Sequence, residues 1–151
     1  MRCVLMIGGS DVAPSSSTVI AKHLLLVEDD VDTRELVADS LRGAGYTVEE
    51  AGDGRDALAA IMRECPSLLI TDCNMPNMSG NELVEHLALD VRLCSMPVIV
   101  VSALKQPRLP ANVIVSLTKP FKIGELVAAI RRCLAASSDA SEHDPNQSSL
   151  P

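Results

Sequence analysis

The chain has 151 residues, a formal net charge of −7 and only two aromatic residues, Tyr46 and Phe121. Negative charge repels phosphate backbones and two rings cannot stack a row of bases, so we expect no direct nucleic-acid binding. No apolar run approaches the roughly 20 residues that cross a bilayer, so we expect no membrane span. The length fits one domain with tails, and its core must be aliphatic.

Cysteine spacing and the first residues bear on the cellular compartment. The five cysteines lack CxxC spacing and are odd in number, so free thiols in a reducing cytoplasm are favoured over disulfides or zinc ligation. Residues 1–22 show no sustained periodicity and are expected to be a disordered extension. A secretory signal is the alternative, but the initial apolar run is short and no small-residue cleavage site follows it.

From His23 onward, apolar runs alternate with helical periodicity, which is typical of a parallel sheet covered by helices on both faces. The strands are expected at residues 23–27, 46–50, 67–71, 97–101 and 112–117. The second strand alternates apolar and polar residues, as an edge strand does. These elements predict one domain over residues 23–136, and the polar residues 137–151 are expected to form a disordered tail.

Capping residues mark where the first three helices are expected to begin. The expected caps are Asp32 with Glu35, then Asp53, then Ser79 with Glu82. Apolar residues at helical spacing predict four buried stripes. They are Val37, Leu41 and Ala44; Leu58, Ile61, Met62 and Cys65; Val84, Leu87, Ala88 and Val91; and Leu126, Ile130, Cys133 and Leu134.

Two prolines interrupt the segment between the fourth and fifth strands. Pro107 and Pro110 each remove a helical hydrogen bond and restrict the residue before them. The fourth helix, which would lie between these strands, is therefore expected to be short or irregular.

Polar side chains follow four of the expected strands. Glu28 and Asp29 follow the first, Asp72 the third, Ser102 the fourth and Lys119 the fifth. The carboxyl ends of parallel strands meet at one edge of the sheet, where ligands of open α/β folds bind. Carboxylates there repel one another, by ~4 kcal/mol for a pair about 4 Å apart at an effective dielectric constant of ~20. A cation is therefore required, and Mg²⁺ prefers such oxygen ligands.

Each of these motifs has a commoner explanation when it is taken alone. An acidic loop such as residues 28–30 is usually only solvated, Asp72 fits a turn aspartate, and Lys119 before Pro120 fits an exposed turn lysine. Their occurrence together, each at the end of a strand, favours a functional site.

The same residues, in the same order, resemble the receiver domain of two-component response regulators. Asp29 and Asp72 are 43 residues apart, Asp72 and Ser102 are 30 apart, and Lys119 begins a Lys-Pro-Phe run. The resemblance covers about residues 22–136. It implies a flavodoxin-like, doubly wound α/β fold with five parallel strands in the order 2-1-3-4-5.

By this resemblance, Asp72 is the phosphoacceptor. Its carboxylate would attack the phosphoryl group of a phosphohistidine on a sensor histidine kinase or a histidine phosphotransfer protein. The Ser102 hydroxyl and the Lys119 ammonium would hold phosphoryl oxygens. The resemblance thus implies a cytoplasmic phosphoprotein of two-component signalling, and no enzyme beyond its own phosphoryl transfer and dephosphorylation.

The resemblance also implies a Mg²⁺ site at the same edge. Asp29 and Asp72 would bind the ion through their side chains, and Asn74 would bind it through its backbone carbonyl. Glu28 would reach the ion through a water molecule.

Two features depart from the family pattern. Ser116 stands three residues before Lys119, where the family usually carries Tyr or Phe as the aromatic partner of its conformational switch. Ser102 and Lys119 are only 17 residues apart, which is shorter than usual and shortens the fourth helix. With no effector region expected after residue 136, the domain would act alone through protein contacts.

Two other functions compete with this interpretation. A degenerate receiver that serves as an interaction module without phosphorylation is favoured by Ser116, but the intact acids, Ser102 and Lys119 argue against it. A metal-dependent phosphohydrolase with an aspartyl intermediate would need a second acid two residues after Asp72, and that residue is Asn74.

Overall fold

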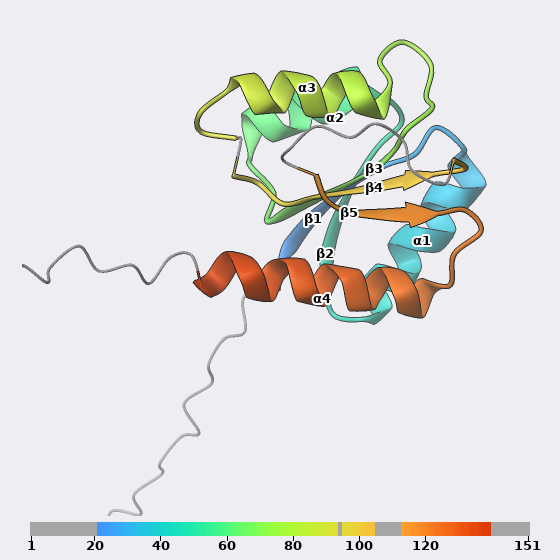
Figure 1. Cartoon of the computed structure of the whole chain (residues 1–151). Coiled ribbons are helices and arrows are strands. Elements are labelled where there is room, and N and C mark those ends of the chain that lie inside the picture. Colours follow the sequence, from blue (N-terminus) through green and yellow to red (C-terminus); the bar gives the residue numbers. More distant parts are fainter. Residues whose placement is uncertain (1–20, 94, 105–112, 140–151) are drawn as a thin grey trace, which may run out of the picture.

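The computed structural model describes residues 21–93, 95–104 and 113–139. These residues form one five-stranded parallel sheet with the strand order β2-β1-β3-β4-β5 and helices on both faces (Figure 1). The expected fold and strand order are therefore confirmed. Residues 1–20 of the expected extension, the segment with Pro107 and Pro110, and the tail after residue 139 lie outside the described residues.

Strands and helices alternate through most of the chain. The elements are β1 (His23–Val27), α1 (Val31–Gly43), β2 (Thr47–Ala51), α2 (Gly54–Arg63), β3 (Leu68–Asp72), α3 (Gly80–Leu89), β4 (Val98–Ser102), β5 (Val113–Thr118) and α4 (Ile123–Asp139). Each strand lies within one residue of its expected range. Helix α4 continues to Asp139, three residues into the segment that was expected to be a tail.

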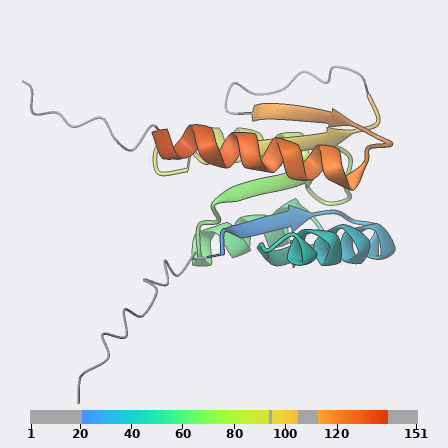
Figure 2. The ribbon, with the colours of Figure 1, turned by 90° about the horizontal axis from the view of Figure 1, so that it is seen from below.

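The described helices cover the sheet in pairs, α2 with α3 on one face and α1 with α4 on the other (Figures 1 and 2). The buried residues of the first pair include Ala57, Ala60, Ile61, Leu83, Val84 and Leu87. Those of the second pair include Val37, Ala38, Leu41, Leu126, Ala129, Ile130 and Cys133. None of these helices combines the length and the apolar character that a bilayer crossing requires.

The central strands are buried on both faces, which explains their continuous apolar sequences. In β1, Leu25 and Val27 pack toward α2 and α3, whereas Leu24 and Leu26 pack toward α1 and α4. Every residue of β3 and β4 is buried. A strand with no solvent face has no position for an alternating polar residue, so β3 and β4 are apolar until their carboxyl ends, at Thr71 and Asp72 in β3 and at Ser102 in β4.

The register of the sheet aligns the carboxyl ends of the strands. Val27 of β1 pairs with Thr71 of β3, and Asp72 pairs with Val101 of β4. Ser102 pairs with Thr118 of β5. Residues that directly follow these pairs therefore emerge at one edge of the sheet.

The first helix begins two residues earlier than the sequence suggested. Asp30 is its N-cap, because the Asp30 carboxylate accepts a 2.7 Å hydrogen bond from the amide of Thr33. Asp32 lies in the first helical turn. The predicted cap of Asp32 with Glu35 was wrong because two aspartates compete here, and the one whose carboxylate reaches a free amide becomes the cap.

The caps of the other two helices are as expected. The Asp53 carboxylate accepts hydrogen bonds from the amides of Arg55 and Asp56, at 2.8 and 2.9 Å. Ser79 and Glu82 form a reciprocal capping box at the start of α3. These short polar motifs set the helix starts that follow the sheet edge.

A few residues of the expected buried stripes are exposed, and most of them lie at helix ends. The exposed exceptions are Ala44, Met62, Cys65, Ala88 and Val91. Ala44 is the C-cap of α1, and Cys65 and Val91 lie beyond the last turns of their helices, where helical periodicity no longer applies. Met62 and Ala88 lie next to the buried stripe and face outward.

The edge strand β5 is only partly covered. Its residues alternate between half-buried and exposed, and Ile114 is 52% exposed. Val115 and Leu117 pack toward α4, whereas Ser116 and Thr118 are exposed. The unusual serine of this strand therefore lies on an open surface rather than in the core.

Candidate functional site

The four strand ends that carry polar residues meet at one edge of the sheet. Glu28 follows β1, and its amide donates a 3.1 Å hydrogen bond to the Ala51 carbonyl of β2. Asp72 is the last residue of β3, and Ser102 is the last residue of β4. The Lys119 amide donates to the Ser102 carbonyl at 2.8 Å, which brings Lys119 to the same edge.

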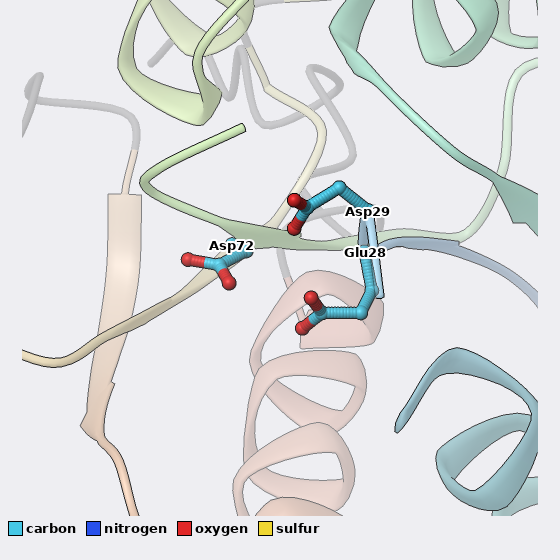
Figure 3. Close-up of side chains that lie close together, drawn as sticks. All are labelled: Glu28, Asp29 and Asp72. Atoms are coloured by element: carbon cyan, nitrogen blue, oxygen red, sulfur yellow. The ribbon is translucent and has the colours of Figure 1, made fainter. Parts of the chain in front are cut away.

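Three carboxylates converge there, and their side chains reach toward a common space (Figure 3). Glu28, Asp29 and Asp72 each present an oxygen atom, and these atoms lie within 4.8 Å of one another. Glu28 and Asp72 are buried, with 7% and 9% of their surface exposed, while Asp29 is exposed. Like charges this close and this buried require a cation.

Lys119 supplies one positive charge to this cluster. Its ammonium lies 2.6 Å from a carboxylate oxygen of Asp72 and 3.0 Å from one of Glu28. Burial acts against the charged ammonium, but the bonds to Asp72 and Glu28 outweigh it, and the pKa of Lys119 is raised above its ordinary value. The family resemblance assigns Lys119 to phosphoryl oxygens, whereas its contact with Glu28, a residue 91 positions away, is seen only in the structure.

The environment of Glu28 disfavours its charged form. Burial raises the pKa of Glu28 above its ordinary value, although Lys119 and the Asp30 amide act in the opposite direction. The neighbouring charge of Asp72 adds to the increase. The charged form of Glu28 is therefore poorly solvated, and a bound cation would favour it.

The start of α3 holds the backbone around Asp72. The Asn74 amide donates to Oδ1 of Asp72 at 3.1 Å, and the Gly80 amide donates to the Cys73 carbonyl at 3.0 Å. A Cβ atom on Gly80 would overlap the Asp72 carbonyl oxygen, so this close approach requires glycine. The position of Asp72 is thus determined by both the strand before it and the helix after it.

A contact that sequence analysis missed ties the loop after Asp72 to α2. Asn77 adopts a left-handed backbone conformation with φ 66°, and its side-chain amide donates to Oδ2 of Asp53 at 2.8 Å. The Gly54 amide also donates to the Met78 carbonyl, at 3.3 Å. Asp53 signals a cap and Asn77 a turn, but no local pattern shows that the two meet.

Ser102 and Cys73 lie buried beside Asp72. Ser102 has no exposed surface, and its hydroxyl oxygen accepts a 3.1 Å hydrogen bond from the Leu104 amide. Burial raises the pKa of Cys73, against a smaller opposing effect of its hydrogen bond with Ser102. The thiol therefore stays neutral and is a poor nucleophile.

The donor set suits a small divalent cation. Oxygens at about 2.1 Å from an octahedral Mg²⁺ ion place opposite ligands about 4.2 Å apart. The oxygens of Glu28, Asp29 and Asp72 all lie within 4.8 Å of one another, so the cluster is compact enough to hold one such ion, directly or through water. Carboxylates are also the ligand type that Mg²⁺ prefers, so these residues fit the ion.

Residues 24–131 match the family model of the response regulator receiver domain, and the chain belongs to this family. Receiver domains are signalling domains of two-component systems. They bind Mg²⁺ at an acidic pocket and interact with histidine kinases or phosphotransfer proteins. The resemblance noted in the sequence is therefore confirmed.

Two curated relatives show how the chain compares in length. The phosphate regulon transcriptional regulatory protein PhoB of Pseudomonas aeruginosa is 31% identical over 132 residues, which cover 84% of this chain and 58% of PhoB. An uncharacterized 14.6 kDa protein of Leptolyngbya boryana is 33% identical over 129 residues, 82% of this chain and 98% of that protein. The chain thus spans little more than half of PhoB but nearly all of the second relative.

Solved structures agree on the fold. The chemotaxis protein CheY4 of Vibrio cholerae is 30% identical with a TM-score of 0.69, over 75% of this chain and 98% of CheY4. A CheY-like receiver domain protein from Methanospirillum hungatei is 26% identical with a TM-score of 0.73, over 80% of this chain and 98% of that one.

Proposed function

We propose that this domain accepts a phosphoryl group on Asp72 from a phosphohistidine, with Mg²⁺ as cofactor, and signals through protein contacts. The proposal rests on one observation, which is the group of charged side chains around Asp72. Two further carboxylates lie within 4.8 Å of this buried carboxylate, and the Lys119 ammonium lies 2.6 Å from it. Membership of the receiver family supports the same reaction.

In the proposed step, a carboxylate oxygen of Asp72 attacks phosphorus and forms an O–P bond. The N–P bond of the donor phosphohistidine breaks, and its electron pair stays on the imidazole nitrogen. The product is an aspartyl phosphate, a covalent state that carboxylate nucleophiles are known to form. The Asn74 amide, 3.1 Å from Oδ1, keeps the carboxylate oriented for this attack.

The acids of the cluster are proposed to hold Mg²⁺. Asp29 and Asp72 would bind it through their side chains, Asn74 through its backbone carbonyl, and Glu28 through a water molecule. When bound, the ion neutralises negative charge on the acids and on the phosphoryl oxygens.

Lys119 and Ser102 are proposed to hold the phosphoryl oxygens. The transition state of phosphoryl transfer spreads negative charge over these oxygens, so an ammonium and a hydroxyl donor stabilise it. Lys119 would exchange its contact with Asp72 for one with the transferred group. The two residues come from neighbouring strands and are linked by the 2.8 Å hydrogen bond between their backbones.

A groove beside the site is the proposed contact for the donor protein. Its volume is about 440 Å³, and it is lined by residues of α1 and of the segment after β5, including Leu36, Lys119 and Phe121. Leu36 is 67% exposed. An apolar groove that reaches Lys119 would let a sensor histidine kinase or a histidine phosphotransfer protein place its phosphohistidine at Asp72.

A pair of leucine variants tests the groove. Leu36→Glu should slow transfer from a phosphorylated donor protein by about tenfold, the cost of ~1.4 kcal/mol in docking. Labelling by acetyl phosphate, which needs no docking surface, should be unchanged. Leu89→Glu is the control, because Leu89 is 84% exposed at the end of α3. Equal slowing with both phosphate donors would show that Leu36 supports the site itself instead.

Chemical labelling tests the acceptor. The protein is incubated with acetyl phosphate and Mg²⁺, reduced with borohydride to trap the acyl phosphate, and mapped by mass spectrometry. The label should lie on Asp72, and Asp72→Asn should remain folded and take no label. Label that persists in Asp72→Asn, or that lies on Ser102, would contradict the assignment.

The proposed reaction takes place in the cytoplasm. Cys65, Cys73 and Cys133 are free thiols in the described residues, which fits a reducing compartment. The negative net charge disfavours direct nucleic-acid binding, so the proposed partners are proteins.

A degenerate receiver that works as an interaction module is the second candidate. The exposed position of Ser116 on β5 favours it, because the usual aromatic of the switch is replaced there by a small polar side chain. This candidate predicts no labelling of Asp72 under the conditions above. It also predicts partner binding that Asp72→Asn leaves unchanged.

A further inference from the structure

Arg34 of α1 bonds to the backbone that carries the acidic cluster. Its Nη1 atom donates a 2.7 Å hydrogen bond to the carbonyl oxygen of Glu28. Strand β1 ends at Val27, so Glu28 lies beyond the last strand pairing. The Glu28 amide is bound to the Ala51 carbonyl at 3.1 Å. Both the amide and the carbonyl of Glu28 are therefore hydrogen-bonded, and Arg34 supplies the bond to the carbonyl.

Arg34 is itself confined. Its Nε atom lies 3.5 Å from a carboxylate oxygen of Glu50 in β2, and its side chain is 18% exposed. The guanidinium also lies against Gly52, where a Cβ atom would be 3.5 Å from Nη1. A planar guanidinium that is paired and packed holds a hydrogen-bond acceptor in one direction.

We propose that Arg34 is a positioning residue for the metal site and acts through the Glu28 carbonyl. The proposal rests on the Mg²⁺-dependent function proposed above. The peptide that Arg34 holds joins Glu28 to Asp29, and both side chains belong to the carboxylate cluster. A shift of this one peptide therefore moves two of the three acids relative to Asp72.

Loss of the positive charge of Arg34 would change the Mg²⁺ affinity in the opposite direction from loss of its bond to the Glu28 carbonyl. A cation near the cluster repels a second cation, so loss of the Arg34 charge alone would tighten Mg²⁺ binding. The ion pair with Glu50 compensates this charge, and positioning is the dominant effect. The two effects predict changes of opposite sign in Mg²⁺ affinity, which makes them separable.

Arg42 offers a matched control on the same helix. It pairs with the same Glu50, at 2.8 Å, and donates to the Val48 carbonyl at 3.0 Å. Neither contact involves the peptide between Glu28 and Asp29. Arg42→Met thus removes the same charge and an ion pair to the same carboxylate, but not the bond to Glu28.

Calorimetric titration of Mg²⁺ into the full chain tests the proposal, with circular dichroism to check that each variant is folded. Arg34→Met should weaken Mg²⁺ binding about tenfold, the lower end of the usual loss when a group that orients a metal ligand is removed. Arg34→Lys retains a donor and should restore part of the affinity. Arg42→Met should bind Mg²⁺ as the wild type does.

Unchanged or tighter Mg²⁺ binding by Arg34→Met would overturn the proposal, as would equal weakening by Arg42→Met. Either result leaves the proposed function standing. A wild-type chain that binds no Mg²⁺ would overturn the proposed function and this inference with it. If Arg34→Met does not fold, Glu50→Gln replaces it, because it loosens Arg34. Glu49→Gln removes the same charge from the same strand, but Glu49 pairs with His23 and Arg63 instead of Arg34. Weaker Mg²⁺ binding by Glu50→Gln than by Glu49→Gln would support the proposal, and equal binding by the two would overturn it.

Discussion

The ammonium of Lys119 lies 2.6 Å from a carboxylate oxygen of Asp72, so the proposed nucleophile is directly paired with a cation. The same ammonium contacts Glu28 at 3.0 Å. Lys119 thus supplies part of the positive charge that the carboxylate cluster requires. It competes with a metal ion for two of the acids, and under the proposed mechanism it leaves Asp72 for the phosphoryl group.

Replacing Lys119 should separate its effect on stability from its effect on metal binding. Lys119→Met should lower the unfolding free energy without Mg²⁺ by ~1 kcal/mol, since the Lys119 side chain is 31% exposed and its ion pairs are partly screened by water. It should bind Mg²⁺ about tenfold more tightly, because a competing cation is gone, equal to ~1.4 kcal/mol. Urea unfolding and calorimetry measure the two effects. Weaker Mg²⁺ binding in this variant would contradict the competition.

Mg²⁺ should stabilise the folded chain, because only the folded state brings the three acids together. The gain in unfolding free energy is ~2.7 kcal/mol at 100 times the dissociation constant. Asp29→Ala should remove most of the shift in melting temperature. Asp39→Ala is the control, since that side chain is 79% exposed on α1. If Mg²⁺, Mn²⁺ and Ca²⁺ all leave the melting temperature unchanged, there is no metal site in the cluster.

The raised pKa of Glu28 predicts a pH-dependent effect of neutralising it. A carboxyl group with a raised folded pKa stabilises the protein below its unfolded pKa and loses this contribution as pH rises through the folded value. Glu28→Gln stays neutral throughout. In metal-free buffer it should therefore match the wild type below pH ~4 and become the more stable protein toward pH 7. Urea unfolding across this range measures the difference, and a variant less stable at pH 7 would contradict the burial effect.

The close approach of α3 to Asp72 makes Gly80 sensitive to substitution. Gly80→Ala forces a Cβ atom into the Asp72 carbonyl and should lower the unfolding free energy by ~1–3 kcal/mol. Gly124 in α4 has no atom within 4 Å of an added Cβ. Gly124→Ala should be neutral or stabilising by up to ~1 kcal/mol, because alanine favours the helix. Similar losses in both variants would show that the contact at Gly80 is unimportant.

Ser116 predicts an unusual response to phosphorylation. Its small side chain has little apolar area to bury in one state rather than another, and a switch needs such a difference between states. Beryllofluoride, a mimic of the phosphoryl group, should therefore shift amide signals in the loops after Asp72 and Ser102 and leave the protein monomeric. Light scattering and amide NMR report these outcomes. A dimer with shifts centred on residues 104–118 and 123–135 would contradict this prediction.

The amino-acid sequence by itself determined the element positions and the residues at the sheet edge, whereas the strand order came from the resemblance to the receiver family. Buried strands are recognisable as apolar runs, and each of these runs stops at a polar residue such as Asp72 or Ser102. These signals are local, so they can be recognised in the sequence without knowledge of the fold. The one misplaced cap, Asp32 in place of Asp30, reflects two neighbouring aspartates that only helix geometry distinguishes. The chemical roles of Asp72, Ser102 and Lys119 stay predictions for the experiments above.

Tertiary structure alone decided which of these groups touch. Lys119 meets Glu28 across 91 positions, Asn77 meets Asp53 across 24, and Arg34 reaches the Glu28 carbonyl from the next helix. Each of these residues has a plausible local role in the sequence, as a turn lysine, a cap, a turn residue or a helix charge. Their actual partners depend on strand register and helix placement. Hydrogen bonds and ion pairs act over a few ångströms, so only the packed sheet and helices select the pairs that form.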